Sequence, residues 1–184
     1  LLVLWGLLQR TATDEEIAQM RSTLDQAMAE GALGLSSGLA YASAKQATAD
    51  EVMRLAQVLG QHGGIYTTHM RTEFEEIISA MEEAFETGQF AKVPVVISHL
   101  KCAGAGNWGR TKEVLNVMDE AAKHQDVSCD CYPYSASSST LDLKQVTDEI
   151  DIFITWSEAA PEHAGKMLKD IAAEMKLPLM EAAK

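Results

Sequence analysis

The hydrophobic residues of the chain follow two alternating patterns. Short continuous apolar runs predict buried strands near residues 33–36, 65–69, 93–99 and 127–132, and segments with apolar residues every three or four positions predict amphipathic helices between them. The strands begin near residues 33, 65, 93 and 127, so the separations are 32, 28 and 34 residues. Because parallel strands need a helical crossover, this period predicts a parallel sheet built from βα units.

Polar residues and glycines mark the ends of the expected helices. Thr13–Glu16 and Thr48–Glu51 each have the spacing of a capping box, in which a hydroxyl and a glutamate satisfy the first free backbone N–H groups. The first of these helices is expected to stop at Gly31 and the helix after residue 69 at Gly88, because glycine accepts the backbone conformation that ends a helix. A fourth helix is expected over 112–123.

The remainder of the chain is less regular. A serine-rich loop at Ser135–Thr140 is followed by an expected strand at 150–156 and a helix at about 161–175. No linker interrupts the chain, so we predict a single domain, or part of one, over 1–184. The apolar run Leu1–Leu8 is far shorter than the roughly 20 residues that span a bilayer and predicts a buried segment of a larger protein.

Composition limits the class of partner. The chain has 47% hydrophobic and 23% charged residues, which is typical of a globular protein. Its net charge of −12 argues against nucleic acids and anionic membranes as partners, since both attract basic surfaces. The cysteines, Cys102, Cys129 and Cys131, are too few and too oddly spaced for a disulfide framework, which favours the reducing cytoplasm.

Two histidines stand at the ends of successive strands. His69 and His99 are 99 − 69 = 30 residues apart, which is one βα unit. In a (β/α)8 barrel the carboxyl ends of the strands form the catalytic face, and neutral imidazole is a common zinc ligand. The spacing leaves two interpretations open: a pair of metal ligands, or two hydrogen-bonded residues near helix starts. His62, His124 and His163 are expected at the surface.

Five short blocks, taken together, resemble a known family. They are Gly31–Tyr41, Thr68–Arg71, Ile97–Lys101, Asn107–Gly109, and Tyr132–Tyr134 with Ser137 and Ser138 after it. In order and spacing, from about residue 10 to 175, they resemble the signature blocks of the D-aminoacylase (N-acyl-D-amino-acid deacylase) family of the amidohydrolase superfamily. A single block would be a weak signal, whereas five in register are specific.

The resemblance implies a fold and a metal site. The fold would be α/β, a partial (β/α)8 TIM-type barrel comprising about strands 4–7 of a metal-dependent amidohydrolase, from the central part of the enzyme. His69 and His99 would be the zinc ligands of strands five and six. The family's His-x-His pair and cysteine ligand are not found before residue 10, and its catalytic aspartate is expected beyond Lys184. The three cysteines of this chain are not expected to replace the missing ligand.

The resemblance also implies a substrate pocket. The family places substrate-binding groups at positions that match Tyr41, Lys101, Tyr132 and Ser138, and an ammonium with hydroxyls suits a substrate carboxylate. Lys101 follows His99 by two residues, so on an extended strand both would point to the same side. The alternative is loop packing for the tyrosines and a solvated charge for the lysine.

The implied activity is zinc-dependent hydrolysis of the amide bond of N-acyl-D-amino acids by the full-length enzyme, with this chain alone inactive. Two alternatives stay open: a cyclic-amide hydrolase of the same superfamily, and a non-catalytic truncated barrel whose open sheet edges favour self-association. The chain has no arginine after Arg110 that could pair with an acidic substrate side chain, so N-acyl-D-glutamate is the less expected substrate. The expected partner is thus a small N-acyl-amino-acid substrate, with neither nucleic acid nor membrane.

Overall fold

The computed structural model describes residues 10–184, so the expected buried segment Leu1–Leu8 lies outside the described residues. The chain divides into two compact units. The first covers the described residues up to Ala103 together with Asn107–Pro133, and the second covers Gly104–Gly106 and Tyr134–Lys184. No helix within residues 10–184 has both the length and the apolar character needed to cross a membrane.

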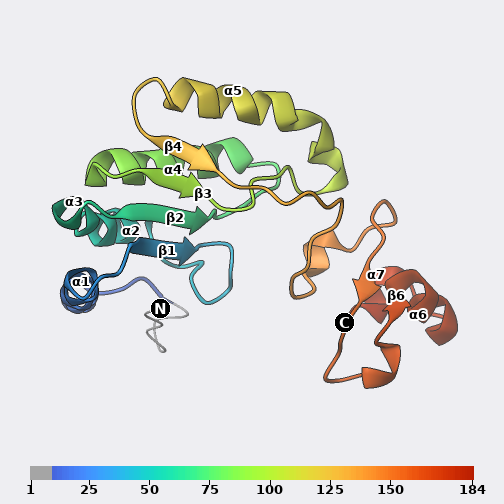
Figure 1. Ribbon diagram of the computed structural model, residues 1–184. Helices are drawn as coiled ribbons and strands as arrows, with labels where there is room; N and C mark the ends of the chain where they lie inside the picture. The colour runs from blue at the N-terminus through green and yellow to red at the C-terminus, as the bar shows by residue number, and fades with distance from the viewer. Residues whose placement is uncertain (1–9) are drawn as a thin grey trace. The chain divides into compact units, whose positions relative to one another are not determined.

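The first unit contains a parallel sheet of four strands in the order β1-β2-β3-β4 (Figure 1). Its strands are β1 (Gly34–Gly38), β2 (Ile65–His69), β3 (Val95–Ile97) and β4 (Val127–Cys129). Its helices are α1 (Asp14–Ala29), α2 (Ala49–Ala56), α3 (Leu59–His62), α4 (Ile77–Ala91) and α5 (Thr111–Ala121). The 3-10 helix η1 (Ala105–Arg110) belongs to this unit from Asn107 onward. Each parallel pair is joined through helices, so the predicted α/β class with a parallel sheet is confirmed.

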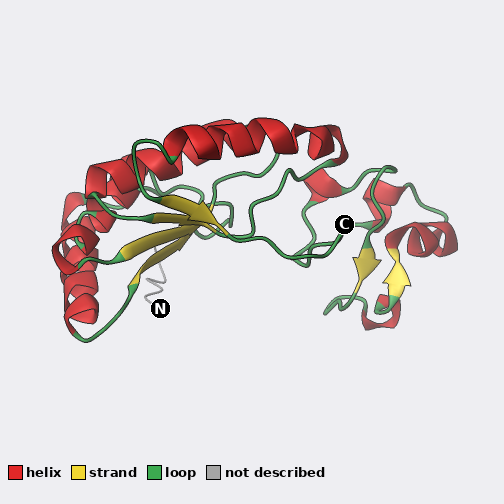
Figure 2. Cartoon of the chain, turned by 45° about the horizontal axis from the view of Figure 1, so that its top comes forward, coloured by secondary structure: helices red, strands yellow, loops and turns green. Residues whose placement is uncertain are grey.

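The helices of this unit lie along one face of the sheet (Figure 2). Alternate strand residues point to that face, and Tyr66, Val95 and Ile97 are buried there in one cluster with Ile77 and Met81 of α4. Burying these side chains against helices is the main favourable term for such a layer. This packing sets the strand positions and therefore the place where each strand ends.

The opposite face of the sheet is open within the described residues. Ser36, Thr67, Val96 and Ser128 are opposite one another in register across the four strands, and each is half-buried or exposed. Three of these four side chains are polar, in contrast to the apolar residues on the face that packs against the helices. A closed eight-stranded barrel stays a prediction.

Two expected boundaries around α4 are wrong. The helix begins at Ile77 and does not stop at Gly88, since it continues to Ala91 and ends on Lys92 with φ of 58°. Gly88 is needed for packing, because a Cβ there would lie 2.1 Å from Cγ2 of Val95. The strand expected over 93–99 is only Val95–Ile97.

The two predicted capping boxes form to different extents. At α1 the full capping box forms: Glu16 N–H donates to Thr13 Oγ1 at 3.3 Å, and Thr13 N–H donates to Glu16 Oε2 at 2.8 Å. At α2 the Thr48 hydroxyl accepts from Glu51 N–H at 3.2 Å, but the Glu51 carboxylate accepts from the backbone N–H of Ala12 at 3.2 Å. Glu51 therefore ties the segment before α1 to α2.

The second unit is small and mostly irregular. Its elements are η2 (Leu143–Gln145), β5 (Phe153–Ile154), η3 (Pro161–His163), β6 (Lys166–Met167), α6 (Leu168–Met175) and α7 (Leu179–Ala182). β5 and β6 pair antiparallel, so the strand expected over 150–156 is shorter, and the helix expected from residue 161 begins at Leu168. Gly165, with φ of 83°, makes the turn that separates η3 from β6.

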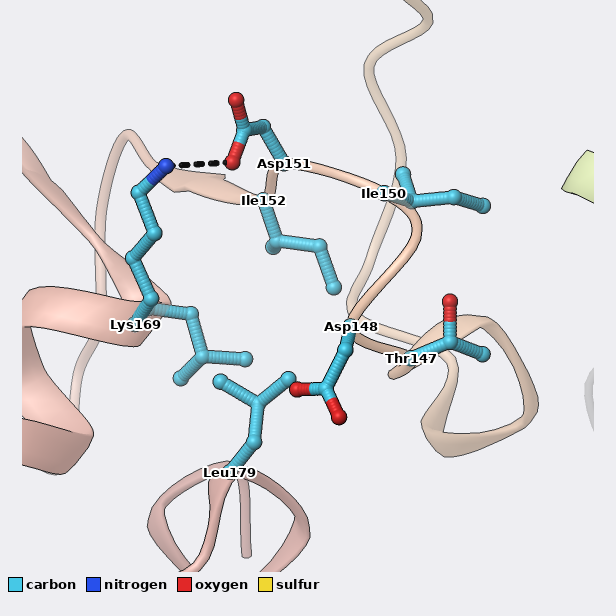
Figure 3. A pocket seen from close by; sticks show the side chains of 8 residues that line it. Thr147, Asp148, Ile150, Asp151, Ile152, Lys169 and Leu179 are labelled. Atoms are coloured by element: carbon cyan, nitrogen blue, oxygen red, sulfur yellow. Dashed lines mark hydrogen bonds and ion pairs between the residues drawn. The ribbon is translucent and has the colours of Figure 1, made fainter.

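A hollow in the second unit lies between the loop 147–152 and helices α6 and α7 (Figure 3). Lys169 Nζ donates to Asp151 Oδ1 at 2.7 Å across its edge. The predicted site residues are not among those that line it.

Candidate metal centre

His69 is the last residue of β2 and lies opposite Gly38 of β1 in register. Side chains alternate along a strand, so His69 shares the face of Thr67, which is the open face of the sheet. The ring is half-buried. The strand thus delivers this imidazole to the carboxyl edge of the sheet, away from the helices.

His99 reaches the same place through an unusual backbone conformation. It lies two residues after Ile97, which packs against the helices, so a continued strand would turn the His99 ring toward that packed face. Instead His99 has φ of 44°, and its N–H donates to Asp130 Oδ1 at 2.7 Å. The expectation of an extended strand through His99 and Lys101 is therefore wrong.

The two imidazoles meet. Nδ1 of His69 and Nε2 of His99 are 2.8 Å apart, and the ring centroids are 4.4 Å apart in an edge-to-face arrangement. The Tyr41 ring lies 4.7 Å from the His69 ring, with its hydroxyl 3.5 Å from the same Nδ1. The structure thus brings together three residues that the sequence placed on separate βα units.

Glu73, in the segment between β2 and α4, lies behind His99. Its carboxylate Oε1 is 2.9 Å from His99 Nδ1, and Lys101 Nζ donates to Oε1 at 2.8 Å and to Oε2 at 2.7 Å. Lys101 Nζ also donates to the backbone carbonyl of His99 at 3.0 Å. Glu73 was not predicted from the sequence as part of the site.

The predicted substrate residues are only partly gathered. Lys101 Nζ lies 5.4 Å from the centroid of the Tyr132 ring, within the range of a cation–π contact. Among the described residues the Tyr132 hydroxyl is one of three buried side-chain atoms without a hydrogen-bond partner. Ser138 belongs to the second unit, on its exposed loop, and its role stays a prediction.

The loop that carries Tyr41 is held by Arg71. The guanidinium pairs with Glu83 of α4, with N···O distances of 2.6 and 2.8 Å, and donates to the carbonyls of Lys45 and Ala47 at 3.1 and 2.9 Å. Fixed guanidinium geometry suits such a four-way contact. Arg71 therefore fastens the loop after β1 to α4.

The donor groups suit a metal ion. Burial lowers the pKa of His69 from its ordinary value, which favours the neutral imidazole that binds metals. His69 Nδ1 and His99 Nε2 are two such donors at one edge. Within residues 10–184 there is no cluster of three or more histidine, cysteine, aspartate or glutamate side chains placed for a metal, and the three cysteines are free thiols. The described residues therefore offer two candidate ligands, and their binding of a metal stays a prediction.

Comparison with known proteins found relatives that match most of this chain. No family model matches the chain. A D-aminoacylase of Alcaligenes xylosoxydans xylosoxydans is 48% identical over 167 residues, which cover 91% of this chain and 34% of the relative. The chain is a relative of the D-aminoacylases. It spans about a third of the length of the curated relatives it matches.

Solved structures of the D-aminoacylases show the same fold over this stretch. A crystal structure of D-aminoacylase, described as defining a novel subset of amidohydrolases, superposes with a TM-score of 0.90 at 42% identity and covers 97% of this chain and 38% of that one. The N-acyl-D-glutamate deacylase of Bordetella bronchiseptica, complexed with zinc and a phosphonate inhibitor, superposes with a TM-score of 0.88 at 36% identity over 96% of this chain and 37% of its own. Metal binding is thus found among these relatives.

Proposed function

We propose that this chain is part of the catalytic barrel domain of a zinc-dependent amidohydrolase that hydrolyses N-acyl-D-amino acids to a carboxylate and a free D-amino acid. The observation that carries the proposal is the meeting of His69 Nδ1 and His99 Nε2 at the carboxyl edge of a parallel sheet. The 48% identity to a D-aminoacylase supports the substrate class.

In this proposal His69 and His99 hold the zinc ion through the two nitrogens that face each other. When bound, zinc supplies a water of lowered pKa and polarises the substrate carbonyl. The chain offers no proton shuttle in its predicted site, and an aspartate beyond Lys184 is proposed for that role. The part of this chain is to hold the metal and to orient the substrate.

Substrate orientation is assigned to four side chains. Lys101 supplies the positive charge for the substrate carboxylate, and Tyr41, Tyr132 and Ser138 supply hydroxyl donors. The unpartnered hydroxyl of Tyr132, whose ring centroid lies 5.4 Å from Lys101 Nζ, supports this assignment, because a buried hydroxyl gains from a polar ligand.

The loop after Tyr134 supplies no arginine to pair with an acidic side chain, which supports a substrate other than N-acyl-D-glutamate. The free cysteines suit a cytoplasmic enzyme.

The test uses the full-length protein that contains this chain, with release of free amine measured from N-acetyl-D-leucine, N-acetyl-L-leucine and a hydantoin. The proposal expects turnover of the D compound well above the other two, and loss of turnover after zinc is removed by a chelator. Faster hydrolysis of the hydantoin would support the cyclic-amide alternative. No turnover of any amide by the zinc-loaded protein would support a non-catalytic barrel.

A further inference from the structure

Glu73 is the most deeply buried charged group at the site. Only 7% of the residue is exposed, although it lies in an irregular segment between β2 and α4. Its backbone carbonyl accepts from Ala103 N–H at 2.8 Å, which ties this segment to the loop after β3. A buried carboxylate is costly unless it is paired and hydrogen-bonded, so its partners indicate its purpose.

Those partners are the ring of one proposed ligand and the ammonium of a proposed substrate group. Oε1 lies 2.9 Å from His99 Nδ1, and Lys101 Nζ lies within 2.8 Å of both carboxylate oxygens. An ionised carboxylate can only accept hydrogen bonds. Lys101 Nζ also lies 3.1 Å from His99 Nδ1, but its three N–H groups already have acceptors in the two carboxylate oxygens and the His99 carbonyl. His99 Nδ1 therefore donates to Glu73, which leaves the lone pair on Nε2, the nitrogen that faces His69.

We propose that Glu73 is a positioning residue with two functions: it sets the tautomer and ring orientation of His99 for metal binding, and it holds Lys101 toward the substrate carboxylate. The inference rests on the proposed metal site and deepens it. A carboxylate behind a ligating histidine raises the basicity of the ring and fixes its direction. In this site the same carboxylate also links the metal ligand to the substrate-binding cation.

The backbone conformation of His99 explains why its ring needs the contact with the Glu73 carboxylate. With φ of 44° the residue leaves the strand, so the packing of β3 does not determine where its ring points. Asp130 holds the backbone N–H, and Glu73 holds the ring. Without Glu73 the imidazole could present either tautomer and several orientations toward His69.

The experiment compares variants of the full-length protein by zinc affinity, measured through competition with a chromophoric chelator. Glu73→Ala is expected to lose about 10- to 100-fold in affinity, the usual effect of removing such a partner. Glu73→Gln keeps one acceptor oxygen and is expected to lie between Glu73→Ala and wild type. Glu76→Ala removes an exposed carboxylate from the same segment and is the matched control, with wild-type affinity expected.

A second readout separates the two functions. N-acetyl-D-leucine and its carboxamide differ in the substrate carboxylate, so the ratio of their KM values reports recognition by Lys101. Lys101→Met is expected to lose this discrimination while keeping zinc, and Glu73→Ala is expected to lose both. A merely structural residue would change neither zinc affinity nor the KM ratio in the folded variant, as checked by circular dichroism.

The outcomes distinguish this inference from the proposed function. Failure of the wild type to bind zinc or hydrolyse the D substrate counts against the proposed function. If the wild type does both and Glu73→Ala keeps zinc affinity within about threefold, the positioning role is overturned. Should Glu73→Ala not fold, Glu73→Gln decides: reduced zinc affinity or a reduced KM ratio supports the inference, and wild-type values of both overturn it.

Discussion

At the scale of single residues, the position of His99 depends on a polar contact that comes from the neighbouring strand. Asp130 follows β4 directly, and its side chain accepts the His99 N–H at 2.7 Å while its own backbone N–H donates to the Ile97 carbonyl at 3.1 Å. A left-handed backbone is uncommon for a residue other than glycine and needs such support. The site is thus shaped by backbone geometry as well as by residue type.

This contact makes a first prediction. Asp130→Ala should lower the free energy of unfolding by about 1 kcal/mol, since the side chain is exposed and solvent replaces part of the lost hydrogen bond. It should also weaken zinc binding, because His99 is no longer held in its turn. Asp130→Asn keeps the acceptor oxygen and should stay near wild type in both. Chemical denaturation and chelator competition measure the two effects, and equal zinc affinity in all three proteins would contradict the assignment.

The sequence indicated some of the site residues and missed others. His69 and His99 stand out because each follows a strand, and the family resemblance singled out Tyr41 and Lys101, which the structure places beside them. Glu73 carries a weaker signal, since a charged residue four positions after His69 in a polar loop is common. Its partners are 26 and 28 residues away, and only the folded chain shows that contact.

At the scale of elements, the packing of α4 on β3 has little tolerance. Replacing glycine by alanine inside a helix usually stabilises it by about 0.5–1 kcal/mol. At Gly88 the new Cβ would meet Val95 Cγ2 at 2.1 Å and the Val93 carbonyl at 3.1 Å. Gly88→Ala is therefore expected to destabilise the protein by about 1–3 kcal/mol, as overpacking does.

Gly109→Ala is the control for this substitution, because nothing lies within 4 Å of its added Cβ. Thermal unfolding of the two variants measures the difference. A Gly88→Ala melting temperature at or above that of wild type would show that α4 and β3 are less tightly packed than the structure indicates.

The loop after β1 gives a second prediction at this scale. Arg71→Ala removes the ion pair with Glu83 and the two contacts to the carbonyls of Lys45 and Ala47, so the unfolding free energy should fall by about 2 kcal/mol. Because this loop carries Tyr41, the KM for N-acetyl-D-leucine should rise in the full-length protein. Kinetics at a temperature where the variant is fully folded separates the two effects.

The matched control is Arg54→Ala. Arg54 pairs with Asp14 at 2.7 Å, but the Asp14 side chain is 82% exposed, so this pair should contribute less than about 1 kcal/mol. Equal destabilisation by the two substitutions would contradict the anchoring role of Arg71.

Periodicity predicted the existence and order of most elements in the first unit. The apolar residues that each strand and helix buries recur in the sequence at the spacing of that element. Periodicity predicted the ends of these helices and strands less accurately. Gly88 is a glycine required by tertiary packing rather than by helix termination, and the strand β3 stops early because His99 turns out of it. Both effects come from neighbouring elements and leave no local signal.

At the scale of the whole molecule, the parallel order of four strands follows from the repeated βα pattern, whereas the second unit had no comparable period. Its short pair β5 and β6 is antiparallel and too short to give an alternating pattern. The assignment of all residues to one catalytic barrel domain stays a prediction. The third metal ligand and the proton shuttle also stay predictions. His69 and His99 come from two strands, whereas a metal site of this kind is assembled from several.

Zinc content per chain distinguishes a zinc site at His69 and His99 from a pair of hydrogen-bonded histidines. The full-length protein and its His69→Ala/His99→Ala variant would be purified in parallel, checked for folding, and analysed by elemental mass spectrometry. The double variant is expected to contain about one zinc ion per chain fewer than the wild type. Equal zinc content in the two folded proteins would contradict it.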